Sequence, residues 1–135
     1  MKRRAARDIA FRLTYEMVMT GTFNHDTEEY LFSEHGDVDV DSRNYVDSIV
    51  AGITEHKKNI EEIIVKYTIG YELSRIYKPD LAVLYLAIYE LIYTDTPKAV
   101  VANEAVEIVK LYSDTQSYSF VNGILASVIK GECGG

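Results

Sequence analysis

The segment from Asp80 to Tyr93 is apolar on nearly every side. Its only charged residues are Asp80 and Glu90, and aliphatic side chains fill most of the other positions: Leu81, Val83, Leu84, Leu86, Ile88, Leu91 and Ile92. A helix that is apolar all round has to be covered by other elements on all of its faces. The segment therefore predicts a central helix around which the rest of the chain packs.

Amphipathic patterns on both sides of this segment supply the covering helices. Apolar residues recur at spacings of three and four, which is typical of one helix face, in residues 6–17, 45–53, 60–67, 100–112 and 120–129. A short helix is expected around Tyr30, Leu31 and Phe32. With the central segment, these patterns predict an all-α fold, a compact bundle of about seven helices in a single domain over residues 1–135.

Residue types at the ends of these stretches indicate where the helices begin and end. Gly21 and Gly70 are expected at helix C-termini, because glycine adopts the left-handed conformation found there. Asp41 or Ser42 is expected to cap the helix that follows, and Thr96 with Pro97 to begin another. Residues 131–135, which include the single cysteine Cys133, are expected to form a flexible tail.

Composition narrows the class of protein. At 47% hydrophobic and 26% charged residues, the chain is in the range of soluble globular proteins. It has no apolar run of the roughly 18 residues that span a bilayer. One cysteine cannot form an internal disulfide, which favours a reducing, cytoplasmic setting.

Positive charge is concentrated at the N-terminus of an acidic chain. The formal net charge is -7, yet five of the 14 basic residues fall within the first twelve positions: Lys2, Arg3, Arg4, Arg7 and Arg12. Phe11 and Tyr15 follow Arg7 at intervals of four, so one helix face would alternate cations with aromatic rings. This end is a candidate contact for an anionic partner; a solvated, slightly basic helix start is the alternative.

Catalytic and metal-binding patterns are weak. Asp37, Asp39 and Asp41 resemble the first ligands of a calcium loop, but Ser42 stands where glycine is needed and Ser48 where the bidentate glutamate is needed. The three histidines, His25, His35 and His56, lack the i, i+4 spacing of a zinc helix. No phosphate-binding glycine loop is present. We therefore expect no enzyme, no cofactor and no metal.

Two further patterns have both a structural and a functional interpretation. Tyr85, Tyr89 and Tyr93 stand four residues apart, and they either pack at the margin of the bundle or form a protein-binding surface. Asn103 and Glu104 interrupt an apolar helix, where they are expected to satisfy buried polar groups.

Three stretches in the C-terminal half resemble one family when taken in order with the basic N-terminus. They are Pro79–Leu91 (PDLAVLYLAIYEL), Val101–Lys110 (VANEAVEIVK) and Phe120–Leu125 (FVNGIL), together with Arg3–Arg7 (RRAAR) and Leu13–Tyr15 (LTY). The chain is similar in these stretches to the bacterial transcription antitermination factors of the NusB family. The resemblance implies a non-enzymatic helical protein of two packed subdomains that acts with RNA polymerase. It would bind single-stranded boxA RNA of ribosomal RNA leaders together with NusE, a ribosomal protein.

The resemblance also assigns roles to individual residues. Lys2, Arg3, Arg4 and Arg7 would contact phosphates, and Tyr15 would stack on a base. Phe120, Asn122 and Gly123 would complete the RNA surface beside the basic helix, although Phe120 could equally be a core residue and Gly123 a point of close helix approach. The assigned NusE contacts are Asp80, Val83 and Ala87.

Two positions depart from the family pattern, and other functions stay open. Tyr85 and Ser119 stand where the family usually has basic residues, so the affinity for RNA alone should be weak and a basic partner should supply much of the binding. The alternatives are a detached accessory domain of a ribosomal RNA methyltransferase and a purely protein-binding adaptor. A homodimer formed through exposed Phe11 and Tyr15 is a further alternative.

Overall fold

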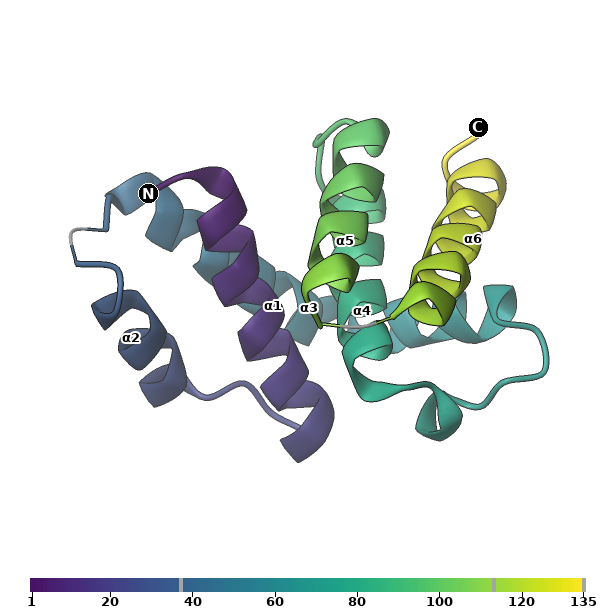
Figure 1. Cartoon of the computed structure of the whole chain (residues 1–135), viewed down its shortest axis with the longest axis horizontal. Helices are drawn as coiled ribbons and strands as arrows, with labels where there is room; N and C mark the ends of the chain where they lie inside the picture. Colours follow the sequence, from purple (N-terminus) through teal and green to yellow (C-terminus); the bar gives the residue numbers. More distant parts are fainter. Residues whose placement is uncertain (37, 113, 135) are drawn as a thin grey trace.

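The computed structural model describes residues 1–36, 38–112 and 114–134, and in these residues helices are the only regular secondary structure. It forms α1 (Arg3–Thr20), α2 (His25–Ser33), α3 (Val40–Tyr67), the 3₁₀ turn η1 (Leu73–Arg75), α4 (Lys78–Tyr93), α5 (Lys98–Tyr112) and α6 (Thr115–Glu132). Figure 1 shows α1, α2 and the first half of α3 at one end of the molecule, with α4, α5 and α6 at the other. None of the described helices is both long and apolar enough to cross a membrane.

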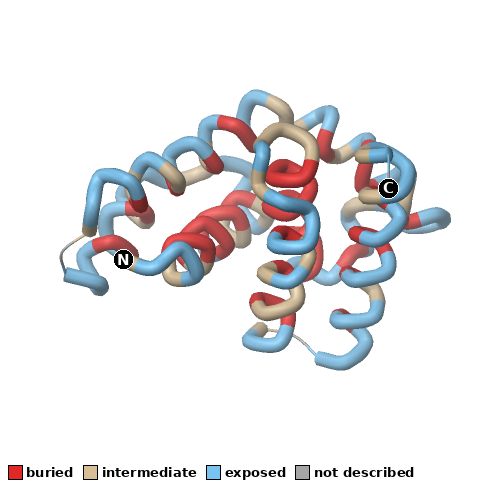
Figure 2. Tube along the Cα trace, turned by 90° about the horizontal axis from the view of Figure 1, so that it is seen from above, coloured by how far each residue is buried: buried red, intermediate tan, exposed pale blue. Residues whose placement is uncertain are grey.

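The central position predicted for residues 80–93 is confirmed. Every residue from Asp80 to Leu91 is buried, and α1, α3, α5 and α6 all pack against α4 (Figure 2). Because no face of α4 reaches solvent along this stretch, this helix contributes more residues to the main hydrophobic core than any other helix does. A smaller core under α2 joins Ile9 and Leu13 of α1 to Phe32 of α2 and Val46 of α3.

The helix count differs from the prediction because residues 45–53 and 60–67 belong to one helix. α3 runs for 28 residues without a break. The polar residues between its two apolar stretches contain neither glycine nor proline, so nothing interrupts the helix. Asp39, not Asp41 or Ser42, caps its N-terminus by accepting a hydrogen bond from the Ser42 amide at 3.1 Å.

The residues predicted to mark the other helix ends can be compared with the observed ends. Gly21 is the predicted left-handed C-cap of α1, at φ 96°. Thr68 ends α3, and Gly70, at φ 86°, lies in the loop that follows. α5 begins at Lys98, directly after Pro97.

Part of the segment that was expected to form a flexible tail is helical. Gly131 and Glu132 belong to α6, where the Glu132 carboxylate accepts hydrogen bonds from Lys66 at 2.8 Å and Tyr67 at 2.6 Å. The Cys133 carbonyl accepts a hydrogen bond from Lys98 at 2.7 Å. These contacts fix the end of α6 against α3 and the start of α5.

Candidate RNA and partner interface

The first turn of α1 presents cations on the surface. Lys2, Arg3 and Arg4 are exposed. The Arg3 guanidinium lies 4.1 Å from the centre of the Tyr45 ring and 3.5 Å from the Asp41 carboxylate. Both contacts are at the surface, where such pairs contribute little stability, so Arg3 can exchange its carboxylate for another anion.

Arg4 is the most accessible of the arginines in this turn. Its side chain is 68% exposed, while its guanidinium donates two hydrogen bonds to the Glu104 carboxylate of α5, at 3.3 and 3.2 Å. These hydrogen bonds raise the pKa of Arg4 further above its ordinary value. Glu104 thus pairs with a surface cation instead of serving a buried connection, and its neighbour Asn103 is exposed, so the predicted structural role of this pair is wrong.

Arg7 does not share this accessible surface. Its side chain is 7% exposed, and its guanidinium donates two hydrogen bonds to Glu90 of α4, at 3.2 and 3.1 Å. Tyr45 donates a third hydrogen bond to Glu90, at 2.8 Å. The phosphate contact predicted for Arg7 conflicts with this geometry, because the guanidinium is enclosed between α1, α3 and α4 and already holds a carboxylate.

Burial and charge act against each other in this network. Burial is the largest single influence and lowers the pKa of Arg7, but the hydrogen bonds to Glu90, together with the electrostatic interactions with Tyr45, Glu90 and Glu104, outweigh it and raise the pKa. Burial, reinforced by the charge of Glu90, raises the pKa of the Tyr45 hydroxyl well above its ordinary range. The network is therefore a neutral ion pair with a protonated tyrosine at physiological pH, and its role is to hold three helices together.

The aromatic residues of α1 are less exposed than the sequence suggested. Phe11 is 1% exposed, which excludes it as the exposed dimer contact considered above. Its ring packs against Tyr112 of α5 with 4.7 Å between ring centres and lies parallel to the ring of Tyr15, 6.1 Å away. Tyr15 is half-buried, so its ring keeps a partly accessible face for a base. Arg12, half-exposed, donates a hydrogen bond to the Tyr112 hydroxyl at 3.2 Å.

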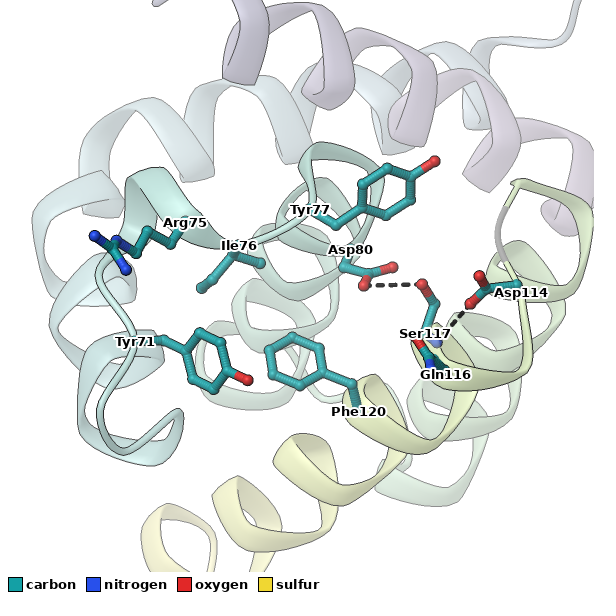
Figure 3. Close-up of a pocket in the computed structure, with 9 residues that line it drawn as sticks. All are labelled: Tyr71, Arg75, Ile76, Tyr77, Asp80, Asp114, Gln116, Ser117 and Phe120. Carbon is teal, nitrogen blue, oxygen red and sulfur yellow. Dashed lines mark hydrogen bonds between the residues drawn. The ribbon is translucent and has the colours of Figure 1, made fainter.

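An aromatic groove with an acidic floor lies between η1 and the start of α6 (Figure 3). It has a volume of about 560 Å³ and is lined by Tyr71, Arg75, Ile76, Tyr77, Asp80, Asp114, Gln116, Ser117 and Phe120. The rings of Tyr71 and Phe120 meet edge to face, 5.7 Å apart. The sequence analysis did not single out Tyr71 or Tyr77, although exposed aromatic residues just before a proline-initiated helix were a usable signal.

A second, shallower hollow lies on the other side of the Phe120 ring. Its volume is about 290 Å³, and Ile69, Tyr71, Phe120, Gly123 and Ser127 contribute to its walls. None of the described residues that line it is acidic. Phe120 and Tyr71 thus form a partition between an acidic groove and an uncharged hollow.

The Phe120–Gly123 segment does not lie beside the basic turn as predicted. α5 stands between α1 and α6 (Figure 1), and Phe120 packs on Tyr71 in the loop before η1. Asn122 and Gly123 are exposed. A Cβ atom on Gly123 would meet nothing within 4 Å, so this glycine does not serve a close approach of two helices.

The three residues assigned to NusE are buried within the chain. Asp80, Val83 and Ala87 are 4%, 2% and 4% exposed. Val83 and Ala87 lie beneath α5 and cannot reach a partner, since helix packing already occupies their faces. The Asp80 carboxylate accepts a hydrogen bond from the Ser117 hydroxyl at 3.0 Å, and it alone of the three borders the acidic groove.

The tyrosines of α4 are structural. Tyr85 is 4% exposed, and its hydroxyl donates a hydrogen bond to Glu61 of α3. Burial and then this carboxylate raise its pKa above the ordinary range. Tyr93 stacks on His56 with 3.8 Å between ring centres. A basic residue at position 85 would point into this interface between α3 and α4, so the difference from the family pattern at Tyr85 affects helix packing. Ser119, the second position that differs from the family pattern, is exposed.

The aspartates of the acidic loop that the structure describes have partners within the chain. Asp39 binds the N-terminal amine at 3.0 Å, which is the largest cause of its lowered pKa. Asp41 pairs with Arg3. Asp37, the first position of the calcium-like pattern, lies outside the described residues.

Comparison with known proteins places these features in a family. The model of the NusB family matches residues 4–130. The transcription antitermination protein NusB of Acetivibrio thermocellus is 40% identical, with 96% of this chain and 90% of that protein covered, and NusB of Finegoldia magna is 40% identical with 96% and 95% covered.

Solved structures support the same family assignment. T. maritima NusB superposes with a TM-score of 0.83 at 30% identity, covering 97% of this chain and 92% of that chain. A complex of the antitermination factors NusB and NusE with double-stranded RNA contains a chain that superposes with a TM-score of 0.84 at 28% identity, covering 95% and 96%. The chain described here therefore belongs to the NusB family.

Proposed function

We propose that this protein is a transcription antitermination factor that binds boxA-type single-stranded RNA of ribosomal RNA leaders together with NusE, as part of the transcription elongation complex. The family is non-enzymatic. The observation that carries the RNA contact is the exposed cationic turn of Lys2, Arg3 and Arg4 on a chain with a net charge of -7. The similar NusB chain that was solved with NusE and RNA supports the partners.

The proposed RNA surface has two parts. Lys2, Arg3 and Arg4 contact phosphates, where the arginine fork gives paired hydrogen bonds, and the accessible side of Tyr15 stacks on a base. Phe120, Asn122 and Gly123 form the second part at the uncharged hollow, where no carboxylate repels the RNA backbone. Since α5 separates the two parts, a single strand that touches both has to cross α5 (Figure 1).

Charge counting indicates that this surface alone binds weakly. Three phosphate contacts to single-stranded RNA give a salt dependence with a slope of about -2. The acidic remainder of the chain opposes the RNA further. A basic protein partner that covers part of the acidic surface would therefore raise the affinity.

The acidic groove is the proposed contact for that partner. Asp80 and Asp114 line it together with the rings of Tyr77 and Phe120, and Asp114 lies beside Ser117 at its edge (Figure 3). Aromatic walls around carboxylates favour an arginine or lysine side chain, which can stack on a ring and approach an acid at once. NusE would thus meet Asp80 through the groove and not through Val83 or Ala87.

The test is RNA binding by fluorescence anisotropy, with and without NusE, for Arg4→Ala and for Lys58→Ala. Lys58 is an exposed lysine in the middle of α3, so its replacement removes the same charge from a helix that contributes no residue to the proposed RNA surface. We expect Arg4→Ala to weaken binding roughly tenfold, the loss of one charge-assisted contact, and Lys58→Ala to have little effect. Equal affinities for the two variants would reject the cationic turn. RNA that never joins a NusE complex would favour a purely protein-binding adaptor.

A further inference from the structure

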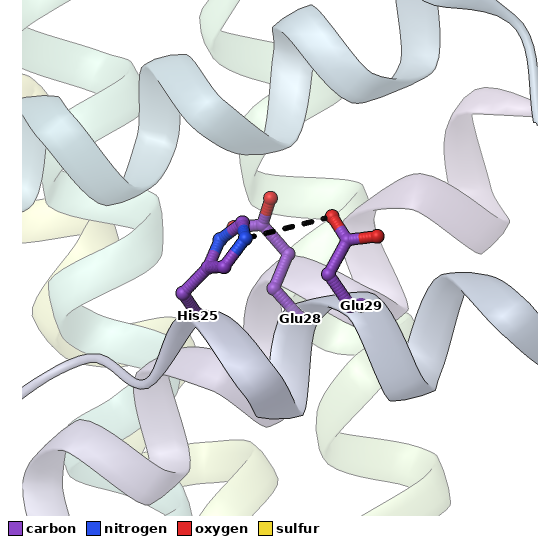
Figure 4. Close-up of side chains that lie close together, drawn as sticks. All are labelled: His25, Glu28 and Glu29. Carbon is purple, nitrogen blue, oxygen red and sulfur yellow. Dashed lines mark ion pairs between the residues drawn. The ribbon is translucent and has the colours of Figure 1, made fainter.

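Three side chains that commonly bind metals meet at the start of α2. His25, Glu28 and Glu29 stand at i, i+3 and i+4, which places them on one face of the helix. One ligand atom from each lies within 4.8 Å of the others (Figure 4). The face is turned toward α3, because Glu29 accepts a hydrogen bond from Arg43 at 2.8 Å and Glu28 meets the Asp47 carboxyl.

Glu28 is the unusual member of this group. It is 6% exposed, and among the described residues its hydrogen-bond partner is Asp47, a second acid. A buried carboxyl group that faces a second carboxyl group is unfavourable unless a proton or a cation lies between them. His25 and Glu29 bring two further ligand atoms beside Glu28, so the position suits a cation.

The charge of the surroundings matches a divalent ion. Glu28, Glu29 and Asp47 carry three negative charges when ionised, and Arg43, paired with Glu29, supplies one positive charge. With a neutral His25, the net charge is -2. One divalent cation would neutralise it.

We propose that His25, Glu28 and Glu29, with Asp47 of α3 beside Glu28, form a site for a divalent transition-metal ion of the Zn²⁺ type, which joins α2 to α3. An imidazole nitrogen with carboxylate oxygens is a usual donor set for Zn²⁺, whereas Ca²⁺ and Mg²⁺ prefer oxygen ligands alone. Two ligand atoms on a tetrahedral zinc ion lie about 3.3 Å apart, because each bond is about 2.0 Å long. The three atoms on α2 lie within 4.8 Å of one another, so they have to approach by up to about 1.5 Å, and the exposed His25 side chain can rotate to do so.

Such an ion would stabilise the part of the molecule with the smallest core. α2 is held mainly by the minor cluster around Phe32 and Val46. A ligand that bridges α2 and α3 in the folded state raises the free energy of unfolding according to its concentration. The site would thus couple metal to the order of α2, away from the proposed RNA and NusE contacts.

The experiment titrates Zn²⁺ into the full chain carrying Cys133→Ser, which removes the thiol as a competing ligand, and follows binding by calorimetry and stability by circular dichroism. Glu28→Gln and His25→Gln are the test variants. His35→Gln is the matched control, since His35 is an exposed histidine outside the cluster.

We expect one Zn²⁺ per chain and a rise in melting temperature of roughly 5–10 °C at a hundredfold excess over the dissociation constant. Glu28→Gln and His25→Gln should each lose at least tenfold in affinity, while His35→Gln should bind like the parent. Glu28→Gln keeps the shape of the protonated acid, so it should fold in the absence of metal. Absence of saturable binding, or equal binding by Glu28→Gln, would mean that Glu28 only shares a proton with Asp47 and would overturn the proposal.

Discussion

Replacing Arg7 with alanine removes the cation that neutralises a carboxylate in the interior of the bundle. The side chains of Arg7 and Glu90 are 7% and 3% exposed, and they are joined by two hydrogen bonds. After the substitution, Glu90 keeps the Tyr45 hydroxyl as a donor but has no positive charge beside it. Loss of one partner from a buried ion pair costs about 3–5 kcal/mol, because the remaining charge is left uncompensated.

We expect Arg7→Ala to lower the free energy of unfolding by about 3 kcal/mol, the lower end of that range, since Tyr45 still satisfies part of the carboxylate. The measurement is urea unfolding followed by circular dichroism. Arg12→Ala is the matched control on the same helix. The Arg12 side chain is 49% exposed and pairs with Asp8 at 3.0 Å, so its loss should cost less than about 1 kcal/mol.

A double variant separates the charge effect from packing. Arg7→Met with Glu90→Leu replaces the pair by apolar side chains of similar length, and it should recover most of the stability lost by Arg7→Ala. A cost for Arg7→Ala no larger than that for Arg12→Ala would refute the buried network.

The RNA affinity of Arg7→Ala, measured well below the melting temperature of this variant, should stay near that of the parent. A loss as large as that of Arg4→Ala in the folded variant would return Arg7 to the RNA surface.

Three further substitutions test other parts of the structure. Gly52→Ala should destabilise the protein by about 1–3 kcal/mol in urea unfolding, because its Cβ would lie 2.2 Å from the buried Tyr89 ring; an unchanged midpoint would contradict that packing. Gly123→Ala should stabilise α6 by about 0.5–1 kcal/mol, since the site is open, and it should weaken RNA binding only if RNA approaches the backbone there. Glu28, with its pKa raised to about 7, binds its proton more tightly when folded than when unfolded. Its contribution is therefore complete below about pH 4.5 and is lost as pH rises through 7. With chelator present, Glu28→Gln should gain about 1–3 kcal/mol over the parent between pH 5 and pH 8; parallel pH profiles would refute the shift.

Periodicity predicted the fold class well because it reports burial directly. The all-round apolar segment after Pro79 could only be a covered helix, and α4 is one. Periodicity predicted the wrong helix boundary in α3, where the helix continues through a stretch of exposed residues. The polar residues between Ile53 and Ile60 face solvent, and the pattern could not distinguish an exposed stretch of helix from a loop. Only the absence of glycine and proline carried that information.

The candidate site was less predictable because spacing in the sequence does not fix which side of a helix is enclosed. Arg4 and Arg7 are three residues apart, and both were assigned to phosphates from the same motif. Their respective partners, Glu104 and Glu90, lie 100 and 83 positions further along the chain. How far Arg4 and Arg7 are buried depends on how α4 and α5 pack against α1. The apolar pattern of α1 alone does not contain this information.

The metal-site hypothesis was missed for a related reason. A search for two histidines one turn apart overlooks a histidine followed by two glutamates on the same face. Asp47 completes the group from a different helix, 19 positions after Glu28 in the printed sequence. Its contribution becomes visible only when α2 lies against α3.

Arg4 is accessible and Arg7 is buried, and this difference determines how the acidic chain can bind RNA. If every N-terminal cation were held by a buried carboxylate, the surface would offer no net attraction to phosphate. Glu90 neutralises Arg7 inside the bundle, whereas Glu104 is at the surface, with its side chain 18% exposed. A phosphate can therefore compete for Arg4 in water, where the Arg4–Glu104 pair is weak. The buried Arg7–Glu90 pair fixes the direction of α1. Arg4, about one helical turn earlier, can exchange its carboxylate partner for a phosphate.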